Sequence, residues 1–272
     1  MQIAIFLLAV CFVVLYFLLC PGRFDDAQRQ MIFGVNHAHR GLHTKDKTVP
    51  ENSLPAFRAA VEAGYGVELD IQLSKDGQVV VFHDDTLDRV CGVHGRVDAF
   101  TLDELRQMRL CGTEETIPLL TEVFDVMAGK TPMIIELKTG PRNAELCEKG
   151  LALMRAYGGP YCIESFDPRI VRWFKKNAPD ILRGQLADAP RSYGQRSRLR
   201  GAVLGGLLLN CIARPQFIAY GPGKKPWTAR LAEALGALRV CWTVRPGDDA
   251  AAKEAENDAV IFEFYRPAPK YR

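Results

Sequence analysis

The sequence of 272 residues lacks several features that mark common classes of protein. Its formal net charge is only +3, which gives no case for the concentrated basic face that nucleic-acid binding usually needs. None of its eight cysteines forms a C-x-x-C pair, so a zinc knuckle is disfavoured and buried free thiols are expected. No G-x-G-x-x-G follows the first predicted strand and no Walker loop is present, so a nucleotide-binding fold lacks its usual mark. Histidine is scarce, and all five histidines lie within residues 37–94.

What the sequence does have is a strongly apolar N-terminus. Residues 3–20 form an unbroken apolar run of 18 residues without charge, glycine or proline. As a helix this run would span about 27 Å, enough to cross the hydrocarbon core of a bilayer. We expect a membrane anchor over residues 1–22 and a polar tether over residues 23–32. A cleaved signal peptide, a lipoprotein cysteine at Cys20 and a buried core helix fit less well, because the run has no basic residue before it, bulky leucines before Cys20 and no polar face.

The flanks of the apolar run predict its orientation. Only the terminal amine precedes the run, whereas basic residues follow it at Arg23, Arg29, Arg40, Lys45 and Lys47. The positive-inside rule then places the remainder of the chain in the cytoplasm, as a single-pass protein of the cell membrane. Free thiols beyond the anchor suit a reducing compartment.

Beyond the tether, apolar strand-like segments alternate with helical ones. Strands are expected at 31–38, 65–73, 77–85, 132–138, 161–166, 182–186, 238–244 and 259–264. Helices are expected at 53–64, 101–108, 119–129, 143–158, 167–179, 226–237 and 248–258, while the apolar residues 201–210 are ambiguous. About eight such units predict an α/β fold, the (β/α)8 TIM barrel, preceded by a transmembrane helix. An open doubly wound sheet is the rival architecture.

Polar residues recur at the C-terminal ends of the predicted strands, where buried parallel strands should be apolar. They are His39 with Arg40, Glu68 with Asp70, His83 with Asp84, Glu136 with Lys138, Glu164 with Ser165, and Trp242 with Thr243. In a (β/α)8 barrel these ends form the active-site face. Glu68 and Asp70 are two residues apart and therefore point to the same side of one strand.

These residue types favour metal-assisted chemistry on a phosphate. Three converging carboxylates, Glu68, Asp70 and Glu136, would resist ionisation without a cation, and oxygen ligands favour Ca²⁺ or Mg²⁺ over zinc. The competing interpretation is a set of salt bridges, from Glu68 to Arg40 and from Glu136 to Lys138. Arg40 and Lys138 beside a divalent ion would form a phosphate site. The only imidazoles at strand ends on this rim belong to His39 and His83, which suits one base and one acid. Together these groups describe phosphodiester cleavage.

Six motifs, in this order, resemble the glycerophosphodiester phosphodiesterase family: HRG (39–41), PENSLPAF (50–57), VELDIQLSKDGQVVVFHDDTLDR (67–89), IIELK (134–138), ESFDP (164–168) and CWTV (241–244). The resemblance implies a barrel over residues 33–272 with a small insertion after the second strand, at about 73–100. It also implies metal-dependent hydrolysis of glycerophosphodiesters to glycerol 3-phosphate and an alcohol. Its ligands would be Glu68, Asp70 and Glu136, its acid/base pair His39 and His83, and its phosphate contacts Arg40 and Lys138. Trp242 would line the glycerol side of the pocket, and Glu51 would support His39 or the metal.

Two stretches depart from the family pattern. The insertion reads RVCGVHG (89–95), and Arg245 follows WTV where the family usually has asparagine. Glu263, in the last strand, is expected to pair with Arg245 across the rim. We interpret His37 as a structural imidazole or one that orients a metal ligand, and His43 as solvent-facing or a contact at the rim.

Several alternatives remain open at the level of sequence. A lysophospholipase D acting on membrane lysolipids uses the same chemistry, and a barrel that only binds phospholipid headgroups would not be an enzyme. A phosphatidylinositol-specific phospholipase C on a similar barrel is a further rival, one that often dispenses with a carboxylate-bound metal. The expected partners are a small glycerophosphodiester and the lipid membrane, with no nucleic acid and no obligate protein partner.

Overall fold

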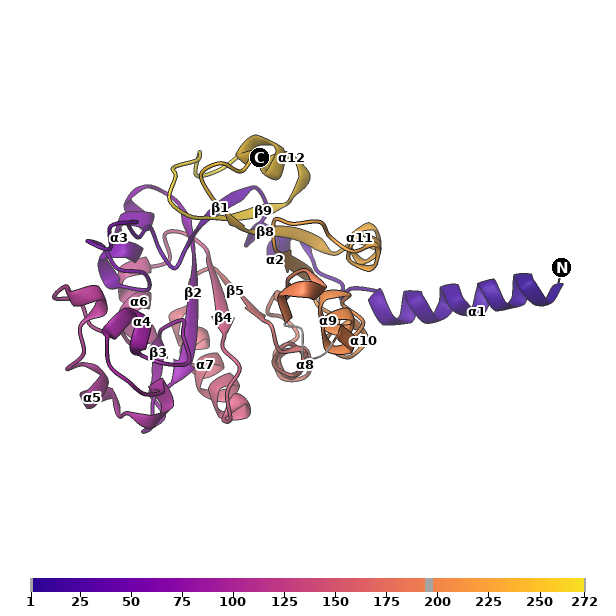
Figure 1. The fold of residues 1–272 in the computed structure, drawn as a ribbon. Coiled ribbons are helices and arrows are strands. Elements are labelled where there is room, and N and C mark those ends of the chain that lie inside the picture. Colours follow the sequence, from indigo (N-terminus) through magenta and orange to yellow (C-terminus); the bar gives the residue numbers. More distant parts are fainter. Residues whose placement is uncertain (1, 194–197, 272) are drawn as a thin grey trace.

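A computed structural model describes residues 2–193 and 198–271 and contains a closed barrel of eight parallel strands (Figure 1). The barrel strands are β1 (Val35–His39), β2 (Gly66–Leu73), β4 (Met133–Leu137), β5 (Tyr161–Ser165), β6 (Arg183–Ala187), β7 (Phe217–Tyr220), β8 (Leu238–Val244) and β9 (Ala259–Phe262). Each strand pairs in parallel with its neighbours, and the β1–β9 and β1–β2 pairings close the ring. The predicted (β/α)8 architecture is confirmed, and the open doubly wound sheet is excluded.

Helices surround the barrel, and in the described part of the chain two helices precede its first strand. They are α1 (Gln2–Leu19), α2 (Asp26–Gln30), α3 (Leu54–Glu62), α4 (Asp88–Cys91), α5 (Leu102–Leu105), α6 (Leu120–Met127), α7 (Asn143–Tyr157), α8 (Pro168–Asn177), α9 (Arg198–Gly205), α10 (Asn210–Ala213), α11 (Trp227–Ala234) and α12 (Ala250–Glu256). Side chains cap two of these helices. The Ser53 hydroxyl accepts a hydrogen bond from the amide of Ala56, and the Asp167 carboxylate accepts one from the amide of Arg169.

The prediction for residues 201–220 was incomplete. The ambiguous apolar stretch 201–210 contributes to α9 and α10, and the seventh barrel strand is Phe217–Tyr220, which was not predicted. With only four residues, this strand is too short to show a clear period in the sequence.

The strands divide their side chains between two layers. On β2, Val67, Leu69 and Ile71 join the core beneath the helices, whereas Glu68 and Asp70 alternate with them and face into the barrel. The interior below the rim is largely apolar and includes Ile134, Phe217, Val240 and Ile261, with His37 among them. The inward alternate positions of the strands therefore carry the polar residues of the upper rim.

Between β2 and α6 the chain leaves the barrel wall. The strand β3 (Val79–Val81) pairs antiparallel with the end of β2, and short helical segments follow at Val97–Ala99 and Leu110–Gly112. This excursion has an apolar cluster of its own, formed by Val80, Phe82, Leu87, Val90, Val97, Leu105, Leu110 and Ile117. It holds His83 above the barrel rim.

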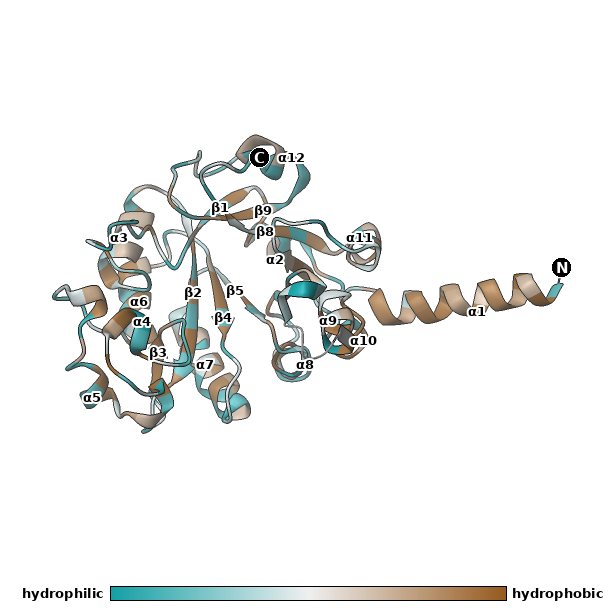
Figure 2. Cartoon of the chain, viewed as in Figure 1, coloured by the Kyte–Doolittle hydropathy of each residue, from teal (hydrophilic) through white to brown (hydrophobic). Residues whose placement is uncertain are grey.

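The helix α1 projects away from the barrel beside α10 and α11 (Figure 1). It is apolar along its length (Figure 2). Its large side chains are exposed, Ile3 to 78% and Phe12 to 65%. Only its last turn packs on the barrel, where Leu19 is fully buried. An 18-residue helix of this composition is long enough to cross a membrane, and a signal sequence would share these properties.

Candidate active site

Four carboxylates face one another inside the C-terminal mouth of the barrel. Oxygen atoms of Glu68, Asp70 and Glu136 lie within 4.8 Å of one another, and all three residues are buried. The strand register explains their convergence, because Asp70 on β2 pairs with Glu136 on β4, and Glu136 pairs with Glu164 on β5. Glu164 is 1% exposed, and its Oε2 has no hydrogen-bond partner among the described residues.

The cluster is short of positive charge. Burial, together with the charge of Asp70, raises the pKa of Glu68 well above its usual value, and burial raises the pKa of Glu136 to about 7. The pKa of Glu164 is likewise raised by burial. Burial would also raise the pKa of Asp70, but Lys138, His83 and Arg40 together lower it. A hard divalent cation fits this donor set, because it would stabilise carboxylates that otherwise bind protons.

Lys138 and Arg40 lie beside the carboxylates. The Lys138 ammonium is 3.0 Å from Glu136 and 3.3 Å from Asp70. Arg40 adopts a positive φ of 53°, which turns its backbone amide toward Glu68 at 3.1 Å. Its guanidinium contacts Glu51 at 2.6 Å and lies 3.6 Å from Asp70.

The salt bridges of the competing interpretation are therefore present only in part. Lys138 pairs with Glu136 as that interpretation requires. Glu68, however, receives only the backbone amide of Arg40, because the guanidinium pairs with Glu51 and Asp70. Neither Glu68 nor Glu164 pairs with a Lys or Arg side chain in the described part of the chain. Salt bridges alone do not neutralise the cluster.

His39 and His83 are held in the same way. Nδ1 of His39 lies 3.2 Å from Oε1 of Glu263, and Nδ1 of His83 lies 2.6 Å from Oδ1 of Asp84. Each carboxylate favours a proton on Nδ1 and leaves Nε2 free to exchange protons. Burial lowers the pKa of His39 to about 4 and also lowers the pKa of His83. Nε2 of His39 lies 3.9 Å from Oε2 of Glu68, so this atom faces the carboxylate cluster.

Arg89 links the carboxylate that holds Arg40 to the carboxylate that holds His83. Its guanidinium donates to both oxygens of Glu51, at 2.7 Å each, and to Asp84 at 2.6 Å. Glu51 in turn holds Arg40, and Asp84 holds His83. Burial would raise the pKa of Glu51, but the hydrogen bonds from Arg89 and the charge of Arg40 lower it to about 2, so it stays ionised.

Glu51 does not contact His39, and its support of a metal stays a prediction. Its carboxylate contacts Arg40 and Arg89 rather than His39 or the carboxylate cluster. The neighbouring Asn52 reaches the cluster instead, and its Nδ2 donates to Oδ2 of Asp70 at 2.9 Å.

Two further histidines, His37 and His43, differ in their surroundings. His37 faces the barrel interior below His39, and neither of its ring nitrogens has a hydrogen-bond partner in the described ranges. Its ring packs against Gly66, as expected of a structural imidazole. His43 is a rim contact, not a solvent-facing residue, because its Nε2 lies 3.1 Å from Glu263. The predicted pair of Arg245 and Glu263 is confirmed at 2.6 Å.

The opposite side of the mouth is apolar. Trp242 faces inward from β8, donates its indole N–H to the carbonyl of Ala219 at 3.0 Å and meets Phe166 edge to face at 5.5 Å.

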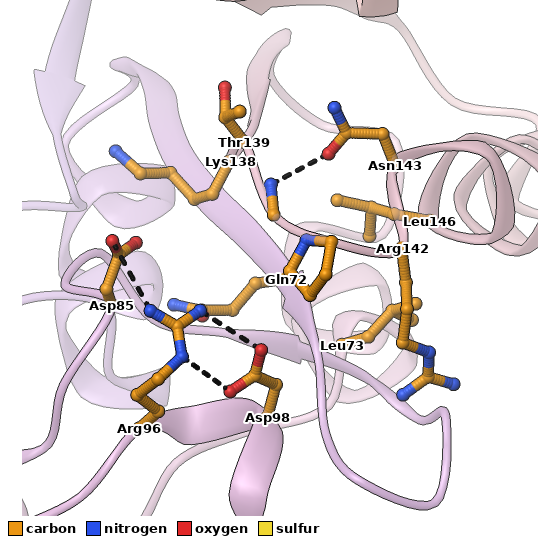
Figure 3. Close-up of a pocket in the computed structure, with 12 residues that line it drawn as sticks. Gln72, Leu73, Asp85, Arg96, Asp98, Lys138, Thr139, Arg142, Asn143 and Leu146 are labelled. Carbon is orange, nitrogen blue, oxygen red and sulfur yellow. Dashed lines mark hydrogen bonds and ion pairs between the residues drawn. The ribbon is translucent and has the colours of Figure 1, made fainter.

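A polar pocket opens beside Lys138, between the insertion and the loop from β4 to α7 (Figure 3). Its lining includes Gln72, Asp85, Arg96, Asp98, Lys138, Thr139, Arg142 and Asn143.

Sequence reasoning missed Asn52, Arg89 and the role of Glu164. Asn52 stands in the PEN motif and has a positive φ of 54°, a conformation that asparagine tolerates better than most residues. Glu164 was noted at a strand end but given no role. Arg89 lies in the diverged insertion, where its ion pairs depend on the folded geometry.

A (β/α)8 barrel whose C-terminal mouth combines buried carboxylates, two cations and two carboxylate-held imidazoles defines a class of barrel suited to phosphate esters. Comparison with known proteins identifies the family within this class. The model of the glycerophosphoryl diester phosphodiesterase family matches residues 39–266, and the chain belongs to that family.

Individual relatives agree with this assignment. A glycerophosphodiester phosphodiesterase of Caldanaerobacter subterraneus subsp. tengcongensis is 38% identical over 162 residues, which cover 55% of this chain and 65% of that protein. The rat lysophospholipase D GDPD1 is 33% identical over 150 residues, covering 50% of this chain and 46% of that protein. The aligned region thus spans less than two thirds of either relative. A phosphodiesterase from Oleispira antarctica, solved in complex with the product sn-glycerol-3-phosphate, has a similar fold, with a TM-score of 0.68, 24% identity and coverage of 85% and 93% of the two chains.

Proposed function

We propose that the chain is a phosphoric diester hydrolase that converts glycerophosphodiesters to glycerol 3-phosphate and an alcohol. The observation that carries the proposal is the pair of imidazoles, His39 and His83, each held through Nδ1 by a carboxylate beside a cluster of buried acids. The family and the glycerophosphodiester phosphodiesterase among its relatives support this substrate class.

Glu68, Asp70 and Glu136 would hold one divalent metal ion, Mg²⁺ or Ca²⁺, since all of their donors are hard oxygens. When bound, such an ion withdraws charge from the phosphate oxygens and so stabilises the transition state. Glu164 would add negative charge from the neighbouring strand.

The side chains of the chain itself would carry the proton transfers. Arg40 and Lys138 would hold the phosphate through its non-bridging oxygens. Nε2 of one imidazole would take the proton of the attacking hydroxyl, and the other imidazole would donate a proton to the departing alcohol oxygen. The substrate's own glycerol hydroxyl is the proposed nucleophile, and water would then open the resulting cyclic phosphate. Trp242 would contact the glycerol carbons.

We further propose that α1 is a retained membrane span with the barrel on the cytoplasmic side. Its length, its uniform apolar surface and the basic residues that follow it support this location. Alkaline carbonate treatment of membranes containing the full chain tests the span. Retention in the pellet is expected, and release into the supernatant would contradict it.

A second candidate is a lysophospholipase D acting on lysolipids, which the anchor and the rat relative favour. The place where the chain beyond α1 attaches to the barrel favours a soluble substrate, because this place lies at the end of the barrel opposite the site. The amide of Gly22 donates to the carbonyl of Pro215 at 3.0 Å, and Gln216 binds the carbonyl of Arg23 at 2.7 Å. Both contacts lie at the N-terminal entry to β7, whereas the site lies at the C-terminal ends of the strands. We therefore expect the mouth to face away from the anchored end.

Turnover by the full chain in detergent tests the reaction. Glycerophosphocholine with added Mg²⁺ or Ca²⁺ should yield glycerol 3-phosphate, and EDTA should stop the reaction. Comparison with lysophosphatidylcholine separates the two candidates. A barrel inactive on every diester and every divalent ion tried would be a headgroup-binding protein instead of an enzyme.

A further inference from the structure

The base of the barrel, where α1 ends, carries a group of cations that the reaction does not use. We define the anchor-base cluster as Arg172 and Lys175 on α8, Arg183 at the start of β6, and Arg214 just before β7. Lys175 donates to the carbonyl of Ile212 at 3.2 Å, and Nη2 of Arg183 donates to the carbonyl of Arg214 at 3.1 Å. Within the described ranges, none of these four side chains forms an ion pair with a carboxylate.

Arg183 is unusual among these cations. It is 5% exposed, and its Nε and Nη1 have no hydrogen-bond partner among the residues that the structure describes. A buried guanidinium without an acid is costly unless an anion approaches it. Burial lowers the pKa of Arg183 to about 10, and burial and the charges of Arg214 and Arg183 lower the pKa of Lys175.

The cluster is fixed directly beneath the anchor. Nη1 of Arg214 donates to the carbonyl of Cys20 at 2.7 Å, and its guanidinium lies 5.0 Å from the ring of Phe17. A side chain at Gly22 would meet Nη2 of Arg183 at about 3.0 Å and the carbonyl of Arg214 at 2.5 Å. The end of α1 thus packs on Arg214 and Arg183, and Lys175 is joined to the same region through the carbonyl of Ile212. A bilayer that holds α1 therefore places its headgroups near these cations.

We propose that the anchor-base cluster is a docking surface for the anionic headgroups of the membrane that α1 crosses. This inference rests on the proposed membrane span. The phosphate and carboxylate groups of anionic lipids would meet the exposed Arg172 and the half-buried Lys175, and their charge would offset that of the buried Arg183 behind them. The docked base would hold the barrel with its catalytic mouth directed away from the bilayer.

The test measures lipid retention by the full chain. The protein is purified in a neutral detergent, mixed with phosphatidylserine or phosphatidylcholine in the presence of EDTA, and examined by native mass spectrometry. Both lipids are glycerophosphodiesters, so binding in the catalytic mouth would contribute to both. Phosphatidylserine carries a net negative charge, whereas phosphatidylcholine carries none, and the variants of the cluster report whether that charge is recognised there. We expect clear preference for phosphatidylserine, reduced about fivefold by each of Lys175→Gln and Arg172→Gln. Lys224→Gln, in the exposed loop at the other end of β7, should leave the preference unchanged.

The possible outcomes are distinct. Equal retention of the two lipids, or a preference unaffected by Lys175→Gln and Arg172→Gln, would overturn the proposal even where carbonate extraction upholds the span. Competition by millimolar inorganic phosphate that removes phosphatidylserine would also overturn it, because the cluster would then be a site for free anions. Release of the chain by carbonate would remove the span and the proposal together. Arg172 is exposed, so Arg172→Gln decides the matter should Lys175→Gln lose its thermal unfolding transition.

Discussion

Oε1 of Glu263 lies 3.2 Å from Nδ1 of His39, and the same oxygen lies 3.1 Å from Nε2 of His43. Oε2 of Glu263 accepts from Arg245 at 2.6 Å. One carboxylate just beyond the last barrel strand therefore orients an imidazole on the first strand. Closure of the barrel between β1 and β9 is what brings these residues together.

Glu263→Gln should impair catalysis without unfolding the protein. An amide at this position no longer favours the Nδ1–H tautomer of His39, so Nε2 is less available for proton transfer. We expect kcat for glycerophosphocholine to fall about 10- to 100-fold with little change in KM. Steady-state kinetics checks this, and Glu62→Gln, an exposed change on α3, serves as the control. A kcat within twofold of the parent value would remove Glu263 from the positioning of His39.

Arg89→Ala should weaken both sides of the mouth at once. Its guanidinium holds Glu51, which binds Arg40, and Asp84, which binds His83. We expect kcat/KM to fall about tenfold or more, equivalent to roughly 1.4 kcal/mol or more of transition-state stabilisation. Both kinetic constants are expected to change, because one arm of the network holds a phosphate ligand and the other a catalytic imidazole.

The matched control for this substitution is Arg106→Ala. Arg106 forms a comparable, partly exposed ion pair with Glu122 at 2.9 Å, outside the mouth. An equal loss of activity in both variants, with equal loss of thermal stability, would assign Arg89 a structural role only.

The order of strands and helices along the sequence predicted both the barrel and the common location of the polar residues at its strand ends. Alternation of apolar segments with helical ones gives the architecture, and polar residues at strand ends then share one rim by construction of the fold. Glu68, Asp70 and Glu136 needed only their strand positions to be placed together, because neighbouring parallel strands lie in register.

Partners that lie across the ring could not be predicted in this way. His39 and Glu263 are 224 positions apart, and their contact depends on how far each strand extends when the barrel closes. Arg89 belongs to an irregular insertion whose path is set by its own small apolar cluster. The pairing of Glu51 with Arg40 depends on the positive φ of Arg40, which no periodicity indicates. The fold was therefore more predictable than the contacts that orient the site.

Metal binding should depend on the buried carboxylates themselves. Isothermal titration of the full chain with Mg²⁺ and Ca²⁺ should show one site, and Glu136→Gln should weaken binding about 100-fold or more, because it removes one of three converging donors. Heat of binding is measured without substrate, so the result is independent of turnover. Glu145→Gln, at a half-buried acid on α7 that pairs with Arg142, should bind metal as the parent does.

Two results would contradict this assignment. Unchanged metal affinity in Glu136→Gln would place the ion elsewhere. Full activity of the parent protein in EDTA would show that the carboxylates serve without a metal, in the manner of a metal-independent phospholipase C.

Gly66→Ala should destabilise the barrel through His37. A Cβ at residue 66 would lie 2.5 Å from Cδ2 of His37, whose ring is buried in the barrel interior. Overpacking of this kind costs about 1–3 kcal/mol, and we expect denaturant unfolding to report a loss of that size. Gly223→Ala, where the added methyl meets nothing, should change stability by less than about 0.5 kcal/mol.

Combining Gly66→Ala with His37→Ala tests whether the clash is the cause. His37→Ala alone should also destabilise, because it leaves a cavity, but the double variant should lose less stability than the sum of the two single losses. The new methyl would then occupy part of the space that the ring vacates. Strict additivity would show that the cost arises in the backbone of β2. Loss of catalysis in His37→Ala with unaltered stability would instead assign this imidazole to the reaction, contrary to its packing against Gly66.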